Sequence, residues 1–581
     1  MPRSLTTTIP TQRGAATTTR ENSHKQLTLR LETSSQRFVP QQTGMARAAY
    51  LAPISRLPIE LLSYIFILGA HTPDPDNSEP GGIEEGDTGI ASDSNDKEDI
   101  SPCLSTSSTP PDVFAAVNRH WREVALNTPQ LWTRVCVTIG DIEHGNSEGW
   151  FPIVARYLAR SGQCPLDVYI DARDPEWDFS EEDSIGAVVS PNIDETYDYV
   201  HPFKVEHMHY LLNTLLPHIA RMRSLAILTD RWASMQTALE CLSFRDPTFV
   251  SLPNPAPLSL PLLESLALMR CNEFVSYHHR FSPPGQHKPA YLPFRGLIPL
   301  SEPSYPREER PLLPRLRQLV LSGVHLDWAS LPLLLPPPRL SGNLGLKRLE
   351  LSYHCAEVRP TEKELREILQ RCASLRTLTV RVSGPQTPES PASCSAVASM
   401  APVALPCLKT LELGYYDVDA IAALTSIIDC SEVEHVALEN SYPVRDESLD
   451  AGPLLLACTK VTSLTSLRCG QPIFPRAKTV ALRRVEASAE TFEAFYEALP
   501  SVRELTVAQM FLLGGKALTS RDVNLTFIPP DSPIAPSASY EWEQGQEHWD
   551  EKWAMLAERP EETRIGRSLG VVPDSQPRTI F

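Results

Sequence analysis

The sequence predicts an α/β protein in which a small all-helical module is followed by a curved solenoid with parallel strands. Three observations lead to this prediction. Two amphipathic helical segments stand near the N-terminus, a short leucine-containing phrase recurs from residue 222 onward, and helical segments fill the intervals between its copies. The 54 prolines among 581 residues are nearly twice the usual share of roughly 5%, which excludes a long helical rod or bundle.

Length, charge and cysteine usage limit the possible classes of protein. A chain of 581 residues is too long for one hydrophobic core, so we expect several domains. The net charge of −18 argues against nucleic acid as the main partner, and no apolar run is long enough to span a membrane. The 12 cysteines are scattered without a C-x-x-C pair, so we expect no disulfide scaffold. This usage fits a reduced compartment, the cytoplasm, the nucleus or both.

Composition divides the chain into five parts. Residues 1–50, with seven Lys/Arg and two Glu, are expected to be a disordered basic tail. A helical module over 51–137 is interrupted at 70–112 by an insert with eleven acids and one lysine. That insert has few apolar residues to offset its ordering entropy, so we expect it to be disordered. A linking α/β region (138–220), the solenoid (221–535) and a C-terminal capping helix and tail (536–581) follow.

The first helix of the module is predicted over 54–68. Pro58 suits the first helical turn, where its missing N–H costs no hydrogen bond. The apolar residues recur every three to four positions and form one wide face, composed of Leu61, Leu62, Ile65, Phe66 and Leu68.

The second helix is predicted over 112–126, with Asp112 capping its first turn and Pro129 following its end. Its apolar stripe contains Val113, Phe114, Val117, Trp121, Val124 and Ala125. Two short helices with such broad apolar faces would leave much hydrophobic surface in water, so we expect them to pack together and against a partner chain.

Three short motifs follow one another in this region: L-P-x-E-L-L-x-x-I-F at Leu57–Phe66, V-N-R-x-W-R-x-x-A at Val117–Ala125 and P-x-L-W at Pro129–Trp132. Together they resemble an F-box, especially that of the F-box-like proteins abundant in fungi. No single piece is specific, but their joint order is. The chain departs from the family at Asn118, where many members have Cys, and in the acidic insert between the helices.

The resemblance implies a three-helix module that docks on a Skp-type adaptor and thereby on a cullin–RING ubiquitin ligase. An ordinary packed hairpin without a ligase role is the alternative. The expected adaptor contacts are Leu57, Pro58, Glu60, Leu61, Ile65, Phe66, Val117, Trp121, Leu131 and Trp132.

The recurring phrase predicts the strands of the solenoid. It reads apolar, two variable residues, apolar, one variable residue, apolar, and its last two apolar residues share one face of a strand. The copies are MRSLAI (222–227), LESLAL (263–268), LRQLVL (316–321), LKRLEL (346–351), LRTLTV (375–380), LKTLEL (408–413), VEHVAL (433–438) and VRELTV (502–507).

Helical text lies between the copies, which predicts parallel strands joined by right-handed crossovers. Thr361 and Glu364 have the form of a capping box, and Asp419 and Thr491 precede two further apolar helical patterns. The spacing of 25 to 33 residues from position 316 resembles that of leucine-rich repeats, in the degenerate form found in F-box proteins, because the closing asparagine is mostly absent. An ordinary α/β domain with chance leucine phrases is the alternative.

The side chains between the leucines are expected to face the concave surface, where they would bind a protein target. They are mixed in charge, which suits a protein or peptide ligand, although a solvated face would look the same. The chosen residues are Arg348, Glu350, Thr379, Arg381, Glu412, His435 and Glu439. The Pro-rich insert 282–314 is a second possible binding element.

Searches for catalytic chemistry give negative results. Gly514-Gly515-Lys516 lacks the Ser/Thr that a phosphate-binding loop needs, and His207 and His209 have no supporting metal-ligand motif, so we expect them to be solvent-exposed. We therefore expect no enzyme, no cofactor and no metal. The sequence predicts a substrate-recognition subunit of a Skp–cullin–F-box type ligase, and a leucine-rich interaction scaffold without ligase role is the alternative.

Overall fold

The chain divides at Arg56 into two units, and the elements discussed below belong to the second, Leu57–Phe581. The computed structural model describes residues 54, 57–71, 110–142, 149–174, 201–243, 260–271, 276, 279–286, 291–297, 312–336, 345–386, 401–441, 450–461, 469–508 and 523–528. The predicted basic tail, almost all of the acidic insert, the segment Gly514–Lys516 and the C-terminal capping helix lie outside these residues.

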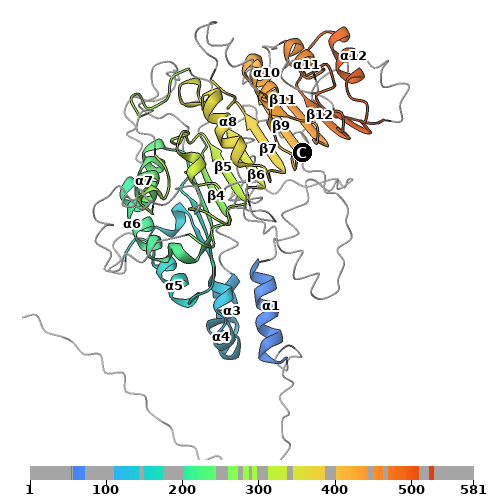
Figure 1. The fold of residues 1–581 in the computed structure, drawn as a ribbon. Helices are drawn as coiled ribbons and strands as arrows, with labels where there is room; N and C mark the ends of the chain where they lie inside the picture. The colour runs from blue at the N-terminus through green and yellow to red at the C-terminus, as the bar shows by residue number, and fades with distance from the viewer. Residues whose placement is uncertain are drawn as a thin grey trace, which may run out of the picture. The chain divides into compact units, whose positions relative to one another are not determined.

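The core of the fold is one open sheet of twelve strands, all parallel to their neighbours (Figure 1). Its order along the sheet follows the order in the chain, as a solenoid requires. The strands are β1 (Arg134–Val137), β2 (Leu166–Asp171), β3 (Met222–Thr229), β4 (Ser265–Arg270), β5 (Gln318–Ser322), β6 (Arg348–Ser352), β7 (Thr377–Arg381), β9 (Thr410–Tyr415), β11 (His435–Asn440), β12 (Thr479–Arg483), β13 (Glu504–Ala508) and β14 (Asn524–Ile528). β8 (Val403–Ala404) and β10 (Ile428–Asp429) pair separately.

All eight leucine phrases form strands of this sheet, which confirms the predicted fold class of a helical module followed by a leucine-rich-repeat-like solenoid. Four strands were not predicted: β1, β2, β12 and β14. The sheet therefore begins at Arg134, inside the range assigned to the helical module, and the region assigned as a linker contributes β2.

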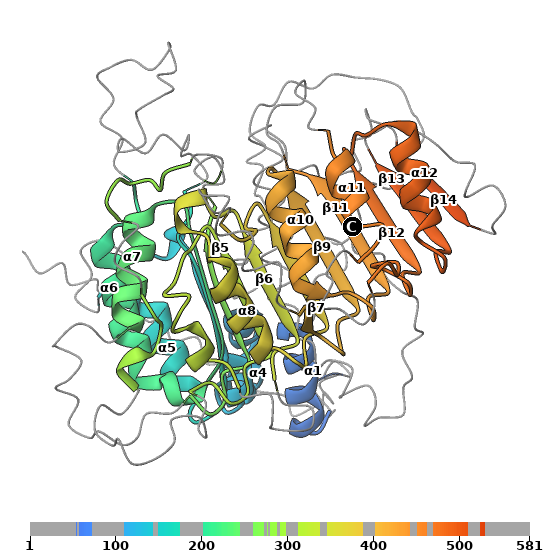
Figure 2. The same ribbon diagram turned by 45° about the horizontal axis from the view of Figure 1, so that its top comes forward.

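The longer helices of the solenoid lie on one side of the sheet (Figure 2). The leucines of the phrases are buried, for example Leu349, Leu351 and Leu378, as expected for the face that helices cover. The helices are α5 (Pro152–Arg160), α6 (Val205–Leu215), α7 (Trp232–Leu242), α8 (Glu362–Arg371), α10 (Val418–Ile427), α11 (Gly452–Ala457) and α12 (Ala489–Glu497), and short 3-10 turns cover Ile139–Asp141, Leu216–Arg221, Arg295–Leu297, Leu331–Leu333 and Ala356–Val358.

The capping box predicted from the sequence is present at the start of α8. The Thr361 hydroxyl accepts from the Glu364 N–H, and the Glu364 carboxylate accepts from the Thr361 N–H, so the capping box is present. At α10 the N-cap is Asp417, and at α12 it is Ser488. Each true cap has extended backbone, which leaves its side-chain oxygen free to reach the N–H groups of the first turn.

The position that asparagine occupies in regular repeats holds His354 after β6. Its Nδ1 lies 2.8 Å from the Ser383 hydroxyl of the next repeat, and its Nε2 lies 3.0 Å from the Val324 carbonyl of the previous one. The buried imidazole thus bridges three successive repeats, as an asparagine amide would. At this repeat, therefore, a histidine links the neighbouring repeats where the regular pattern has asparagine.

Candidate interaction surfaces

The helical module consists of α1 (Ile59–His71), α3 (Pro110–Val117), α4 (Arg119–Leu126) and the 3-10 turn η3 (Pro129–Trp132). Three aromatic rings join the helices. Phe66 of α1 stacks on Phe114 of α3 with ring centroids 4.6 Å apart, and Trp121 of α4 lies 4.9 Å from Phe66. Aromatic pairs at these separations stabilise packing beyond their buried area, so the three helices form one small core.

The single helix expected over 112–126 is in fact two helices, and Asn118 causes the break. Its backbone is extended, with φ −161° and ψ 174°, and its side-chain oxygen accepts from the Trp121 N–H at 2.9 Å. Asn118 is therefore the N-cap of α4, a role that its short amide side chain suits. Asp112 lies inside α3 instead of capping it, and it forms ion pairs with Arg160 at 3.3 Å and Arg156 at 3.6 Å.

Several large apolar side chains of this module are exposed to solvent. We call them the exposed apolar residues of the module: Ile59, Leu61, Ile65, Leu68, Val113, Val117 and Leu126. Leu61 is 52% exposed, Ile65 42% and Val117 53%. Surface of this kind is costly in water and is typical of a protein-binding face.

The predicted adaptor contacts separate into two groups. Pro58, Glu60, Leu61, Ile65 and Val117 are exposed, and Leu57 and Trp121 are half-buried. Phe66, Leu131 and Trp132 are buried instead. Their side chains pack the inside of the module and offer no area to a partner, because they sit on the inner faces of α1 and η3.

Trp132 also joins the module to the first repeat. Its indole N–H donates to the Ala125 carbonyl at 2.9 Å, and its ring packs edge-on against Tyr157 of α5 at 5.1 Å. The guanidinium of Arg160 lies 4.2 Å above the same ring. The next residues of the chain form β1, so the module runs directly into the sheet.

On the face opposite to the leucines, the middle position of each strand forms one row across the sheet. We call this the middle row. In register order it contains Cys136, Tyr169, Ala226, Ala267, Val320, Glu350, Thr379, Glu412, Ala437, Ala481, Thr506 and Thr526.

The first five members are buried and apolar, and together with residues such as Leu228, Met269 and Tyr353 they belong to one hydrophobic cluster. From the sequence, we predicted only polar and charged residues as ligand contacts on this face. The signal was present in the sequence, since the residue between the last two apolar positions is alanine in the first and second phrases and valine in the third.

The predicted target-binding residues lie together on β6, β7, β9 and β11, in the middle row and the rows beside it. Their exposure differs. Glu350, Thr379 and Glu439 are buried, Arg348, Arg381 and Glu412 are partly exposed, and His435 is exposed. The buried members are not available for contact, so only four of the seven offer surface to a ligand.

Several of these side chains form ion pairs with one another. Arg348 binds Glu350 at 3.2 Å, and Glu350 also accepts from the Ser352 hydroxyl at 2.9 Å. Arg381 binds Glu412 at 3.3 Å. Burial alone would lower the pKa of the Arg381 guanidinium, but the carboxylates of Glu439, Glu412 and Glu350 outweigh it and raise that pKa. The charged groups of this face therefore neutralise one another in large part.

The described residues contain no metal-binding cluster and no helix long and apolar enough to cross a membrane. His207 was expected to be exposed, but it is buried beside Trp150, with ring centroids 4.8 Å apart, and its Nδ1 accepts from the Lys204 N–H. It is a packing residue. His209 is partly buried and lies beside Asn213.

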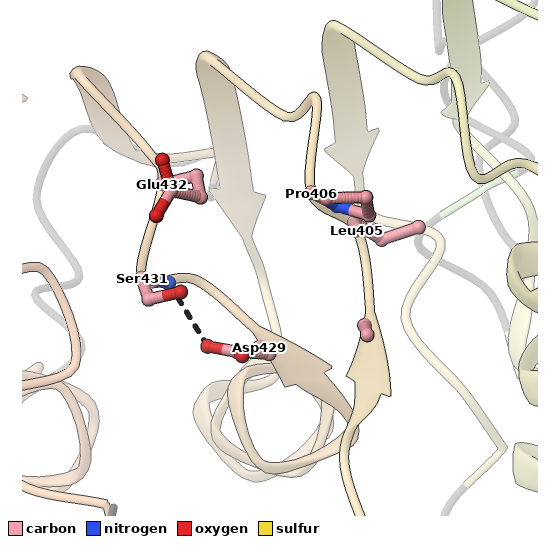
Figure 3. Close-up of a pocket in the computed structure, with 6 residues that line it drawn as sticks. Leu405, Pro406, Asp429, Ser431 and Glu432 are labelled. Atoms are coloured by element: carbon pink, nitrogen blue, oxygen red, sulfur yellow. Dashed lines mark hydrogen bonds between the residues drawn. The ribbon is translucent and has the colours of Figure 1, made fainter.

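A shallow pocket of about 210 Å³ lies beside β8 and β10 (Figure 3). Leu405, Pro406, Asp429, Ser431 and Glu432 line it together with Ala404. The Asp429 carboxylate accepts from the Ser431 N–H at 3.0 Å, which closes a local turn. Glu432 pairs with Lys409 and Arg476 outside the pocket. The described lining holds neither a nucleophile–base pair nor a metal-binding set.

Comparison with known proteins gives no family. No family model matches the sequence, and no curated protein matches it. Eighteen chains of solved structures match. One of them comes from the crystal structure of the yeast Rad7 and Elc1 complex, with 12% identity and a TM-score of 0.28 over 68% of this chain and 76% of that chain. A likeness of this level does not bear on function, so the functional proposal rests on the residues described above.

Proposed function

We propose that this chain is the substrate-recognition subunit of a Skp–cullin–F-box type E3 ubiquitin ligase. The helical module binds a Skp-type adaptor, and through it a cullin–RING ligase, while the repeats bind a protein target. The chain itself performs no catalysis and needs no cofactor. It acts in the cytoplasm, the nucleus or both.

One observation carries this proposal: the F-box-like text forms a module of three short helices with exposed apolar residues. Full burial of a Leu, Ile or Val side chain contributes about 1.5–3 kcal/mol. Leu61, Ile65 and Val117 are each about half exposed, so covering the three would contribute about 1 kcal/mol apiece. That is a sizeable part of the free energy of a micromolar complex, which is about 8 kcal/mol.

In this role the chain accelerates ubiquitin transfer by proximity. Holding a target beside the recruited ligase replaces a bimolecular encounter with an effectively intramolecular one. The sheet suits this purpose because twelve parallel strands give an extended surface on one rigid element. The proposed target contacts are those that the structure leaves accessible, Arg348, Arg381, Glu412 and His435.

The test is capture of a purified Skp-type adaptor by the full-length chain. The variant Leu61→Arg/Ile65→Arg places two charges among the exposed apolar residues of the module. The matched control is Leu333→Arg/Leu456→Arg, which makes the same change at residues that are 46% and 51% exposed in the solenoid. We expect the first variant to lose the adaptor and the second to retain it.

Adaptor capture by the first variant at wild-type affinity would refute the proposal. Failure of the wild-type chain to bind any adaptor or cullin would assign it instead to the alternative, a repeat scaffold without ligase role.

A further inference from the structure

A row of like charges lies at the amino ends of the central strands. The residues that immediately precede β5, β6, β7 and β9 are Arg317, Lys347, Arg376 and Lys409, which we call the basic row. Backbone hydrogen bonds join them in this order, from each N–H to the preceding carbonyl, at 2.6 Å, 2.8 Å and 2.8 Å. The usual strand spacing of about 4.8 Å spreads the four cations over about 14 Å.

Two members of the basic row form no ion pair with a described carboxylate. Within the described residues, neither Lys347 nor Arg376 forms an ion pair with a carboxylate, and Arg376 is exposed. Burial lowers the pKa of the Lys347 ammonium, and the neighbouring Arg376 and Arg317 lower it further. Like charges on adjacent strands repel one another, so an anion bound beside Lys347 and Arg376 would relieve this repulsion. The whole chain has a net charge of −18, so a cluster of four cations is opposite in sign to the chain as a whole.

Carboxylates limit the basic row at both ends. Glu264 precedes β4 on one side, and Glu434 precedes β11 on the other. Glu434 binds Lys409 at 2.7 Å and also pairs with Lys478, and these two partners lower its pKa to about 2. A long polyanion such as nucleic acid would extend past the row, where the net charge of −18 of the chain repels it. The row therefore fits a short anionic ligand.

We propose that the basic row is a docking site for a short acidic stretch of a partner protein. An extended peptide spans about 3.3–3.6 Å per residue, so four or five residues match the length of the row. Charge complementarity of this kind contributes specificity and association rate more than affinity. The row is separate from the exposed apolar residues of the module, and the inference goes beyond the proposed function without depending on adaptor binding.

The test measures binding of a fluorescein-labelled peptide that carries five consecutive glutamates flanked by glycine and serine. A peptide with glutamine in place of glutamate is the neutral probe. Fluorescence anisotropy is recorded with the full-length chain at low ionic strength, where screening is weakest. The variant is Lys347→Glu/Arg376→Glu, and the charge-matched control is Arg119→Glu/Arg122→Glu, at two exposed residues of α4.

We expect the row variant to bind the acidic peptide at least about tenfold more weakly than the wild type, and the control less than about twofold. The glutamine peptide should not bind. The milder variant Lys347→Gln/Arg376→Gln removes the charge without reversing it and should lose about threefold, which keeps the test valid if the reversal impairs folding.

Three results would overturn the inference. Equal losses in the row variant and the control would show that binding follows net charge alone. Tighter binding of a short single-stranded oligonucleotide than of the peptide would make the ligand nucleic acid. Binding of the peptide only after deletion of residues 72–109, which contain ten acids and one lysine, would show that the chain's own acidic segment occupies the row.

Discussion

Lowering the pH should destabilise the solenoid through one buried residue, His354. Burial lowers the pKa of its imidazole to about 4 from an ordinary value of 6.5, and the nearby Arg359 guanidinium lowers it as well, against an opposing hydrogen bond to Val324. The contacts agree with a neutral ring: Nε2 donates to the Val324 carbonyl, and Nδ1 accepts from the Ser383 hydroxyl. A second proton on Nδ1 would remove that acceptor.

The direction and the size of this effect on stability follow from the difference in proton binding between the folded and the unfolded chain. The unfolded chain binds the proton near pH 6.5 and the folded chain only near pH 4, so the unfolded state holds more protons between these values. The stabilisation is therefore present above pH 6.5 and is lost progressively as the pH falls towards 4. A difference of this size corresponds to about 3 kcal/mol at the acid limit.

Urea unfolding followed by circular dichroism at several values of pH between 7.5 and 4.5 measures the effect. Carboxylates also titrate in this range. The informative quantity is therefore the difference in the free energy of unfolding between the wild type and His354→Asn at each pH. Asparagine retains hydrogen-bonding groups at this position but cannot titrate. The wild type should lose more stability than the variant as the pH falls, and parallel curves for the two proteins would refute the reasoning.

Further predictions concern the module and the charged face. Changing Leu57 and Pro58 together to Ala should abolish adaptor capture with the far-ultraviolet spectrum unchanged; retained capture would count against the module as the adaptor site. Asn118→Ala should destabilise α4 by about 1 kcal/mol, seen as about fivefold faster amide exchange there, whereas Asn118→Asp keeps the capping oxygen and should not. Arg381→Met should lower the free energy of unfolding by about 2 kcal/mol because it leaves three carboxylates without their shared cation, and an unchanged urea midpoint would contradict this. Residues 72–109 should be the first site of limited proteolysis.

The strands were predictable because their signal is local. In the phrase LKRLEL, burial of Leu349 and Leu351 on one face follows from the period of two alone, and the structure confirms it. The same period was present but overlooked at β1 and β12, where Trp132 and Ala477 occupy the first apolar position instead of leucine. Both are buried, so the position requires an apolar side chain rather than one residue type.

The sites were less predictable because they depend on packing between distant residues. Sequence alone shows that Glu350 is polar, but not that it lies 2% exposed between Arg348 and Ser352. The break at Asn118 could have been found, since asparagine is a preferred cap, but the apolar stripe continues through it and favoured one helix. The basic row arises only from register, because its members lie 25 or more residues apart in the chain.

Trp132 connects the helical module to the first strand of the sheet. The buried indole of Trp132, its hydrogen bond to Ala125 and the overlying Arg160 link the module to the start of the sheet. Each strand adds about 4.8 Å, which places β6 about 24 Å and β11 about 38 Å along the sheet from β1. If the chain recruits a ligase as proposed, a protein held at a given strand would present its lysines to that ligase at a separation set by the position of the strand in the sheet. Removing one repeat should shift that separation by a single strand spacing and change which lysine is modified.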